Sequence, residues 1–194
     1  YQEKMKNSIL KITIILLSSI LLFSFGLTDV WFSAGSQGKS YKMGIDKGAG
    51  QNGGNAATIK SIDAKIKGFG TFMQQSKPNK YLGKRIKMTG FVKSENVTNW
   101  AGLWLRVDQL GSGKSVSFDN MNDRPIKGTT EWTKYEIILD VPSDASLLAF
   151  GALLSGTGQV WFDNLKFEIV SDIKTESDKT SKTQEKPINL DFEN

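Results

Sequence analysis

The sequence predicts an all-β fold, a jelly-roll β-sandwich, for the greater part of the chain. Three observations predict it: apolar and polar residues alternate in short runs between positions 30 and 170, Gly, Asn, Asp and Pro separate these runs, and helical periodicity is almost absent. A period of two places every second side chain on one face of a strand, which is the pattern of a half-buried strand. Hydrophobic residues make up 39 % of the chain and aromatic residues 10 %, which is enough for a core.

The first 26 residues predict a signal peptide or a membrane anchor. Lys6 and Lys11 precede an uncharged apolar run over 12–25, and Gly26 follows it. A membrane span needs roughly 20 apolar residues, so the short run favours a cleaved signal peptide, with an uncleaved anchor as the alternative. We therefore expect a secreted or extracytoplasmic protein, attached to a membrane only if this segment is retained.

Residues 27–170 form the predicted jelly-roll domain. Three alternations define half-buried strands, and apolar stretches at 69–73, 147–154 and 160–169 add others at a spacing typical of sandwiches. The expected core faces of the three alternating strands carry Ile86, Met88, Gly90 and Val92; Leu103, Leu105 and Val107; and Tyr135, Ile137, Leu139 and Val141.

The composition changes twice after this domain. Residues 171–186 are almost all Ser, Thr, Asp, Glu, Lys and Gln, with very little to bury, and predict a flexible linker. Strand alternation returns in residues 187–194, at Leu190 and Phe192. Three interpretations of this tail strand are open: it completes the sandwich of its own chain, it opens a second, truncated repeat, or it pairs with a neighbouring molecule.

Three segments carry a resemblance to a known group of domains. They are Trp-Ala-Gly-Leu-Trp-Leu-Arg-Val-Asp at 100–108, the segment 118–132, and Gly-Gln-Val-Trp-Phe-Asp-Asn-Leu-Lys-Phe at 158–167. Together they resemble bacterial galactose-binding-like jelly-roll domains, and the last is similar to the closing strand of many carbohydrate-binding modules. Such domains commonly open with a strand like Asn-Leu-Asp-Phe-Glu-Asn, which here stands at 189–194. The group occurs alone and beside transcriptional-regulator domains, so the resemblance implies the fold without fixing the ligand.

The strand around Leu105 carries the first candidate binding residues. Strand alternation places Trp104, Arg106 and Asp108 opposite its core face. An aromatic plane stacks on the apolar face of a sugar ring, and a guanidinium makes paired hydrogen bonds to neighbouring hydroxyls. These residues predict a carbohydrate site on the concave face of the sandwich. The structural alternative is that Trp104 packs inside the protein while Arg106 pairs with Asp108.

Two amides and a loop extend this candidate site. Asn120 and Gln74 each share strand parity with a neighbouring aromatic residue, and ligand hydroxyls are suitable partners for such amides. Met121 and Arg124 follow in the loop before Pro125, where ligand contacts often concentrate. The structural alternatives are amides that cap turns or strand ladders and a solvated loop.

One carboxylate suggests a metal. Asp163 has apolar neighbours on its own strand face unless a bulge at Asn164 shifts the register. The resemblance implies a structural calcium ion held by Asp163 together with Asp191 or Glu193, and oxygen ligands suit calcium. The alternative is that Asp163 caps backbone groups.

Several functions are disfavoured by composition. The chain has no histidine and no cysteine, which excludes Ser-His-Asp and Cys-His catalysis and leaves zinc without its usual ligands. The net charge of +5 comes from dispersed lysines without an arginine-rich run, so we expect no nucleic-acid partner. The glycine-rich segment 48–53 formally fits a dinucleotide motif, but a strand is expected after it at 55–62, where that motif requires a helix.

The sequence therefore predicts an exported, non-catalytic binding module whose partner is a glycan or oligosaccharide and which requires no cofactor. A protein-interaction or sensory, effector-binding domain is the main alternative, with a protein or effector as its partner. A carbohydrate-active enzyme is the third hypothesis, because glycoside hydrolysis needs two carboxylates and the chain has 20 acidic residues.

Overall fold

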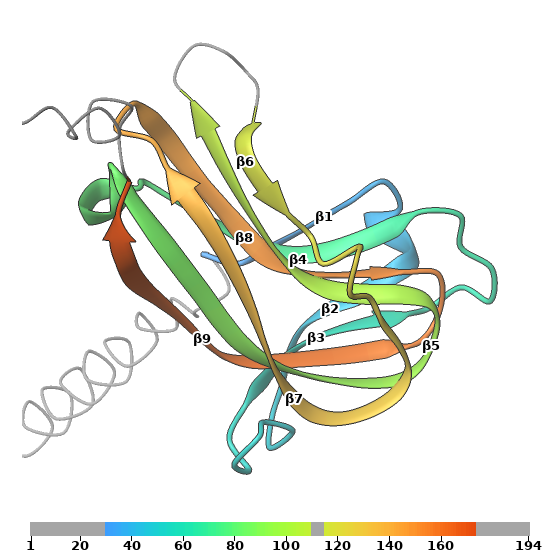
Figure 1. Ribbon diagram of the computed structural model, residues 1–194. Helices are drawn as coiled ribbons and strands as arrows, with labels where there is room; N and C mark the ends of the chain where they lie inside the picture. Colours follow the sequence, from blue (N-terminus) through green and yellow to red (C-terminus); the bar gives the residue numbers. More distant parts are fainter. Residues whose placement is uncertain (1–29, 110–114, 174–194) are drawn as a thin grey trace, which may run out of the picture. The chain divides into compact units, whose positions relative to one another are not determined.

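A computed structural model describes residues 30–109 and 115–173 (Figure 1). The chain divides into two units, 1–32 and 33–194, and the fold discussed below is that of the second unit. The predicted N-terminal segment 1–26 and tail 187–194 lie outside the described residues. Within the described part, no helix is long and apolar enough to cross a membrane. The elements in chain order are β1 (Phe32–Ala34), η2 (Gly38–Ser40), β2 (Tyr41–Asp46), β3 (Ala56–Ser61), β4 (Phe69–Ser76), η3 (Asn79–Tyr81), β5 (Lys84–Gln109), β6 (Ser115–Asp119), β7 (Ile126–Val141), β8 (Ala145–Ser155) and β9 (Gln159–Asp172).

The strands form two sheets that share the long strand β5. Sheet I contains the first half of β5, from Lys84 to Glu95, between β7 and β9, and β3 and β2 follow beyond β9. Sheet II contains the second half, from Trp100 to Gln109, between β8 and β6, and β4 and β1 follow beyond β8. Figure 1 shows β5 running along one sheet, turning, and returning along the other. This arrangement is a jelly-roll sandwich and confirms the predicted fold class.

The turn of β5 between the sheets is fixed by the connection from β8 to β9. Asn96 adopts a left-handed conformation with φ of 52°, and the register of β5 against β7 shifts on either side of Val97. The Thr98 amide donates to the Thr157 carbonyl at 3.0 Å, and the Thr157 amide donates to Thr98 Oγ1 at 2.9 Å. A Cβ at Gly158 would lie 2.7 Å from the Asn96 carbonyl oxygen, so only glycine permits this close approach.

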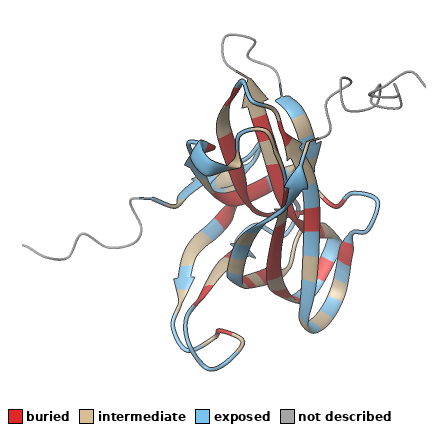
Figure 2. Ribbon diagram, turned by 60° about the vertical axis from the view of Figure 1, so that its left-hand side comes forward, coloured by how far each residue is buried: buried red, intermediate tan, exposed pale blue. Residues whose placement is uncertain are grey.

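The core lies between the two sheets, and both halves of β5 contribute to it. Ile86 and Met88 from the first half and Leu103, Leu105 and Val107 from the second half are completely buried, which confirms the core faces predicted for this strand. On the third predicted face, Ile137 and Val141 of β7 are buried, whereas Tyr135 and Leu139 are only partly buried. Burying one such side chain contributes about 1.5–3 kcal/mol. Figure 2 shows that buried residues are concentrated on the strands, while the connecting loops are largely exposed.

One edge of the sandwich is closed by a buried tyrosine. Tyr41 of β2 in sheet I donates its hydroxyl to the Gly156 carbonyl at 2.8 Å, and burial raises the pKa of Tyr41 to about 12. Its ring lies against Gly70 of β4 in sheet II, where a Cβ would come within 2.5 Å of the ring. The two sheets therefore meet closely at this edge.

Candidate ligand-binding cleft

The outward face of sheet II is hollowed into a cleft of about 370 Å³, within the range of ~300–1,000 Å³ typical of ligand sites. Antiparallel partners share a face, and the register places Trp104 in line with Gly151 and Met73. The cleft is therefore built from the side chains of β4, β5 and β8 that point away from the core. Its lining residues are Ala34, Gly35, Gly68, Phe69, Thr71, Met73, Trp100, Trp104, Arg106, Phe118, Asn120, Leu153 and Ser155.

An apolar cluster forms the floor of the cleft. Met73, Trp104, Ala149 and Leu153 are buried against one another on the outward side of the sheet. Gly151 on β8 lies between its two register partners, Met73 on β4 and Trp104 on β5. A Cβ at Gly151 would lie 2.3 Å from the Phe72 carbonyl oxygen of β4. Glycine at this position therefore lets β4 approach β8 closely.

Trp104 is part of both the packing and the lining. Only 7 % of its surface is exposed, and its indole Nε1–H donates to Thr71 Oγ1 at 2.8 Å. The Thr71 hydroxyl in turn donates to the Ala152 carbonyl at 2.7 Å. The indole is thus held in place, and its polar atom is already engaged by the protein.

Arg106 and Phe118 stand side by side at the rim of the cleft, because they are register partners on β5 and β6. Arg106 Nη2 donates to Asp108 Oδ2 at 2.9 Å, as the structural alternative predicted, yet 40 % of the arginine side chain remains exposed. Arg106 Nε is buried without a hydrogen-bond partner. Phe118 is 51 % exposed and offers an apolar surface next to the guanidinium.

The cleft offers few uncommitted polar groups. Asn120 Oδ1 accepts from the Asn122 amide at 3.2 Å, and among the described residues no acceptor is found for its Nδ2. Arg106 is the one charged residue among those described as lining the cleft. The arrangement therefore combines apolar and aromatic walls with a guanidinium and an amide as donors.

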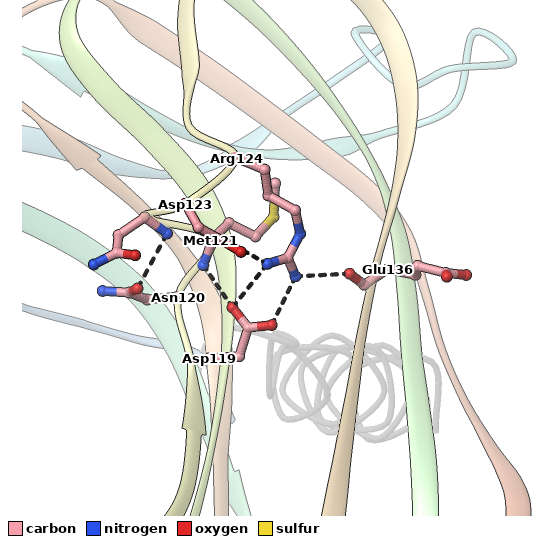
Figure 3. Close-up of polar contacts among 7 residues, drawn as sticks. Asp119, Asn120, Met121, Asp123, Arg124 and Glu136 are labelled. Carbon is pink, nitrogen blue, oxygen red and sulfur yellow. Dashed lines mark hydrogen bonds and ion pairs between the residues drawn. The ribbon is translucent and has the colours of Figure 1, made fainter.

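The loop from β6 to β7 holds Asn120 in position (Figure 3). Arg124 donates from Nη2 to Asp119 Oδ2 at 2.7 Å and to the Glu136 carbonyl at 3.0 Å, and the Asp119 hydrogen bond raises the pKa of Arg124. Asp119 Oδ1 accepts from the Met121 amide at 2.7 Å. Met121 is completely buried and left-handed, with φ of 62°. The structure therefore places Met121 and Arg124 in the framework of this loop, outside the lining of the cleft.

The strand register corrects the predicted position of Gln74. Gln74 is the partner of Phe150 on β8, which is the partner of Leu105, so its side chain lies on the core side of β4. Gln74 was predicted to lie on the ligand-binding surface because it shares strand parity with Phe72. That prediction was wrong, because Phe72 itself faces the core and is only 4 % exposed. Of the predicted residues, the structure brings Trp104, Arg106 and Asn120 into the cleft, with Asp108 behind Arg106.

Asp163 is a backbone cap in the structure. Its Oδ2 accepts from the Gln51 amide at 3.2 Å, and its Oδ1 accepts from the Asn164 amide at 2.6 Å. Asn164 has φ of 55° at an irregularity of the β5–β9 ladder, as expected for a bulge. The other predicted calcium ligands, Asp191 and Glu193, lie outside the described residues. Among those described, no group of three or more acidic side chains is placed to hold a metal, and calcium stays a prediction.

Sequence reasoning missed several residues that line the cleft. Trp100 has the strand parity of Trp104, so alternation alone could have identified it. Alternation also groups Thr71 with Met73 on the face opposite to Phe72, but it does not say which of the two faces lies outward. The missing information was which face of the 69–73 strand is buried. That depends on the pairing between β4 and β8, which sequence parity does not provide.

Several solved structures with the same fold contain carbohydrate-binding modules. A CBM22-1 xylan-binding domain from Paenibacillus barcinonensis is similar with a TM-score of 0.54 at 16 % identity, over 78 % of this chain and 92 % of that chain. A xylanase structure from Clostridium thermocellum, containing CBM22-1 and catalytic modules and complexed with xylohexaose, has a TM-score of 0.53 at 15 % identity, over 74 % of this chain and 26 % of that chain. The fold is that of a carbohydrate-binding-module jelly roll. Identities this low establish the fold alone.

The sequence comparison leads to a different kind of protein. The chain is 40 % identical over 166 residues to YbfP of Bacillus subtilis strain 168, an uncharacterised HTH-type transcriptional regulator, which covers 84 % of this chain and 56 % of that protein. The chain therefore spans a little more than half the length of this relative. No protein-family model matches the chain.

Proposed function

We propose that this chain is an exported, non-catalytic module that binds carbohydrate in the cleft of sheet II. The observation that carries the proposal is the juxtaposition of the exposed Phe118 ring and the Arg106 guanidinium on neighbouring strands. An aromatic ring accepts the apolar face of a sugar, and a guanidinium donates to two neighbouring hydroxyl oxygens. The Asn120 amide adds a further donor at the same rim.

The proposed affinity is modest, because a groove with few polar partners gains only part of the free energy that its area suggests. The fold neighbours support a β-linked polysaccharide as the first ligand to test, since one is described as xylan-binding and another was solved with xylohexaose. Xylohexaose is therefore a reasonable first probe.

Two observations support a module without catalytic activity and outside the cytoplasm. Glycoside hydrolysis requires a pair of carboxylates across the substrate, and no acidic residue is among the described residues that line the cleft. Basic residues followed by an apolar run over 12–25 support export through a signal peptide or anchor.

A second candidate function rests on the sequence relative. Because that relative is named as an HTH-type transcriptional regulator, the same cleft is also suited to a sensory domain that binds a small effector. The two candidates differ in ligand size. A polysaccharide module gains affinity as the oligosaccharide lengthens, whereas an effector-binding domain is saturated by a monosaccharide or disaccharide.

The experiment that tests the proposal is a glycan-array screen of the purified protein, followed by titration calorimetry with oligosaccharides of increasing length. Phe118→Ala should weaken binding about tenfold, corresponding to the loss of about 1.4 kcal/mol. Ile138→Ala is the matched control, because Ile138 is a similarly exposed apolar residue, 46 % against 51 %, on sheet I. A folded protein that binds no glycan, or equal losses in both variants, would refute the carbohydrate cleft.

A further inference from the structure

The outward face of sheet I carries a second hollow, distant in the strand order from the cleft. It has a volume of about 270 Å³ and lies over β2 and β3, between Lys42, Lys60 and Gln159 at one end and Asp46 at the other. Gly44 and Thr58 form its floor, and nothing lies within 4 Å of where a Gly44 side chain would begin. The hollow exists because glycine leaves a gap between two longer side chains of β2.

The basic end of this hollow contains an unusual pair. Lys42 and Lys60 are direct register partners on the antiparallel strands β2 and β3, so their Cα atoms are about 5 Å apart. Like charges placed directly opposite one another destabilise a sheet. Among the described residues, neither lysine forms an ion pair with a carboxylate.

Protection of the sheet edge explains only one of the two lysines. Lysine on an edge strand discourages pairing with other chains, and β2 is the edge of sheet I. Lys60 lies on β3, which is paired with β2 on one side and β9 on the other. The surrounding sequence strengthens the positive field, because residues 38–68 hold six lysines and two aspartates.

The remaining groups are suited to sugar hydroxyls. Gln159 lies next to Lys60 in the register and donates its Nε2–H to Thr58 Oγ1 at 3.1 Å, which leaves its Oε1 as an acceptor. The Asp46 carboxylate accepts from Trp161 Nε1 at 2.7 Å and has capacity for a further donor. Beyond Gln159, the next register partner on this face is Glu95, an exposed carboxylate that limits the positive patch on that side.

We propose that this hollow binds the acidic sugar units of an anionic polysaccharide, with the carboxylate of the ligand between Lys42 and Lys60. The carboxylate forms ion pairs with both ammonium groups and so reduces their mutual repulsion, and ring hydroxyls donate to Gln159 and Asp46. An anionic membrane surface fits the site less well, because the lysines flank a recess that also contains hydroxyl acceptors. The proposal does not depend on the carbohydrate cleft of sheet II.

The test measures retention of the whole protein in gels containing polygalacturonate, with dextran as the uncharged polysaccharide. We expect retention by polygalacturonate that weakens as sodium chloride is added, since salt screens exposed charges. Lys42→Gln together with Lys60→Gln should reduce the affinity about tenfold, the combined effect of two exposed charge contacts. Phe118→Ala should leave this retention unchanged.

A matched double variant separates a defined site from general positive charge. Lys127→Gln with Lys134→Gln removes two exposed lysines from β7, at the opposite edge of sheet I, and should change retention less than about twofold. The proposal is overturned if both double variants lose affinity equally, if polygalacturonate does not retain the wild-type protein, or if Lys42 and Lys60 are needed only for binding to phosphatidylserine vesicles. Thermal unfolding verifies that each variant is folded.

Discussion

The two faces of the second half of β5 have different roles, although their residues alternate along one strand: one face packs in the core and the other lines the cleft. Leu103, Leu105 and Val107 point into the sandwich and are completely buried. Trp104 and Arg106 point outward into the cleft, the first nearly buried and the second partly exposed. The inward face therefore contributes stability, and the outward face combines packing with an open surface for a ligand.

This difference shows why burial alone does not separate structural from binding residues here. Trp104 is almost as inaccessible as a core residue, yet it forms the floor of a hollow outside the core. The distinguishing feature is what lies above each side chain: the opposite sheet covers Leu105, whereas the cleft lies above Trp104. Substitutions on the two faces should therefore separate stability from affinity.

The largest effect is expected from Leu105→Ala on the inward face. Leu105 has no exposed surface, so the cavity should lower the free energy of unfolding by about 3 kcal/mol, as measured by urea denaturation. Titration of the remaining folded protein with its best oligosaccharide should give nearly unchanged affinity. A variant that keeps its stability but loses binding would contradict the division between the two faces.

A smaller effect is expected from Trp104→Phe on the outward face. Phenylalanine keeps an aromatic floor but removes the Nε1–H that donates to Thr71 Oγ1. Loss of this buried hydrogen bond should cost about 1–2 kcal/mol of stability and change the affinity by less than about threefold, because the indole nitrogen is already engaged. Thr71→Val should behave similarly in denaturant titrations. The double variant should cost less than the sum of the two, since one bond is shared; strictly additive costs would show that the bond contributes nothing.

The fold was predictable from local pattern, whereas the site was predictable only in part. Alternation identified the buried faces around Met88 and Leu105, because every second side chain of a strand lies on the same face whichever strands are its neighbours. It also placed Trp104, Arg106 and Asn120 on one surface. It failed for Gln74, because the orientation of β4 is set by its register against β8.

The loop residues show a second limit of sequence reasoning. Met121 lies in a loop between polar residues, a setting that suggested exposure. A left-handed backbone and the Asp119 cap turn its side chain into the protein. The hollow beside Lys42 and Lys60 could not be predicted from the sequence either, because the pairing of β2 with β3 determines which lysines lie opposite one another.

The most direct test of the central claim follows the five tryptophan indole N–H signals by NMR during titration with the best-binding oligosaccharide. Trp100 and Trp104 line the cleft, while Trp161 lies on β9 of sheet I and is bonded to Asp46. Binding in the cleft predicts that the Trp100 and Trp104 signals shift together with one dissociation constant while the Trp161 signal stays in place. Movement of Trp161 with the two cleft signals unchanged would place the carbohydrate site on sheet I and contradict the account.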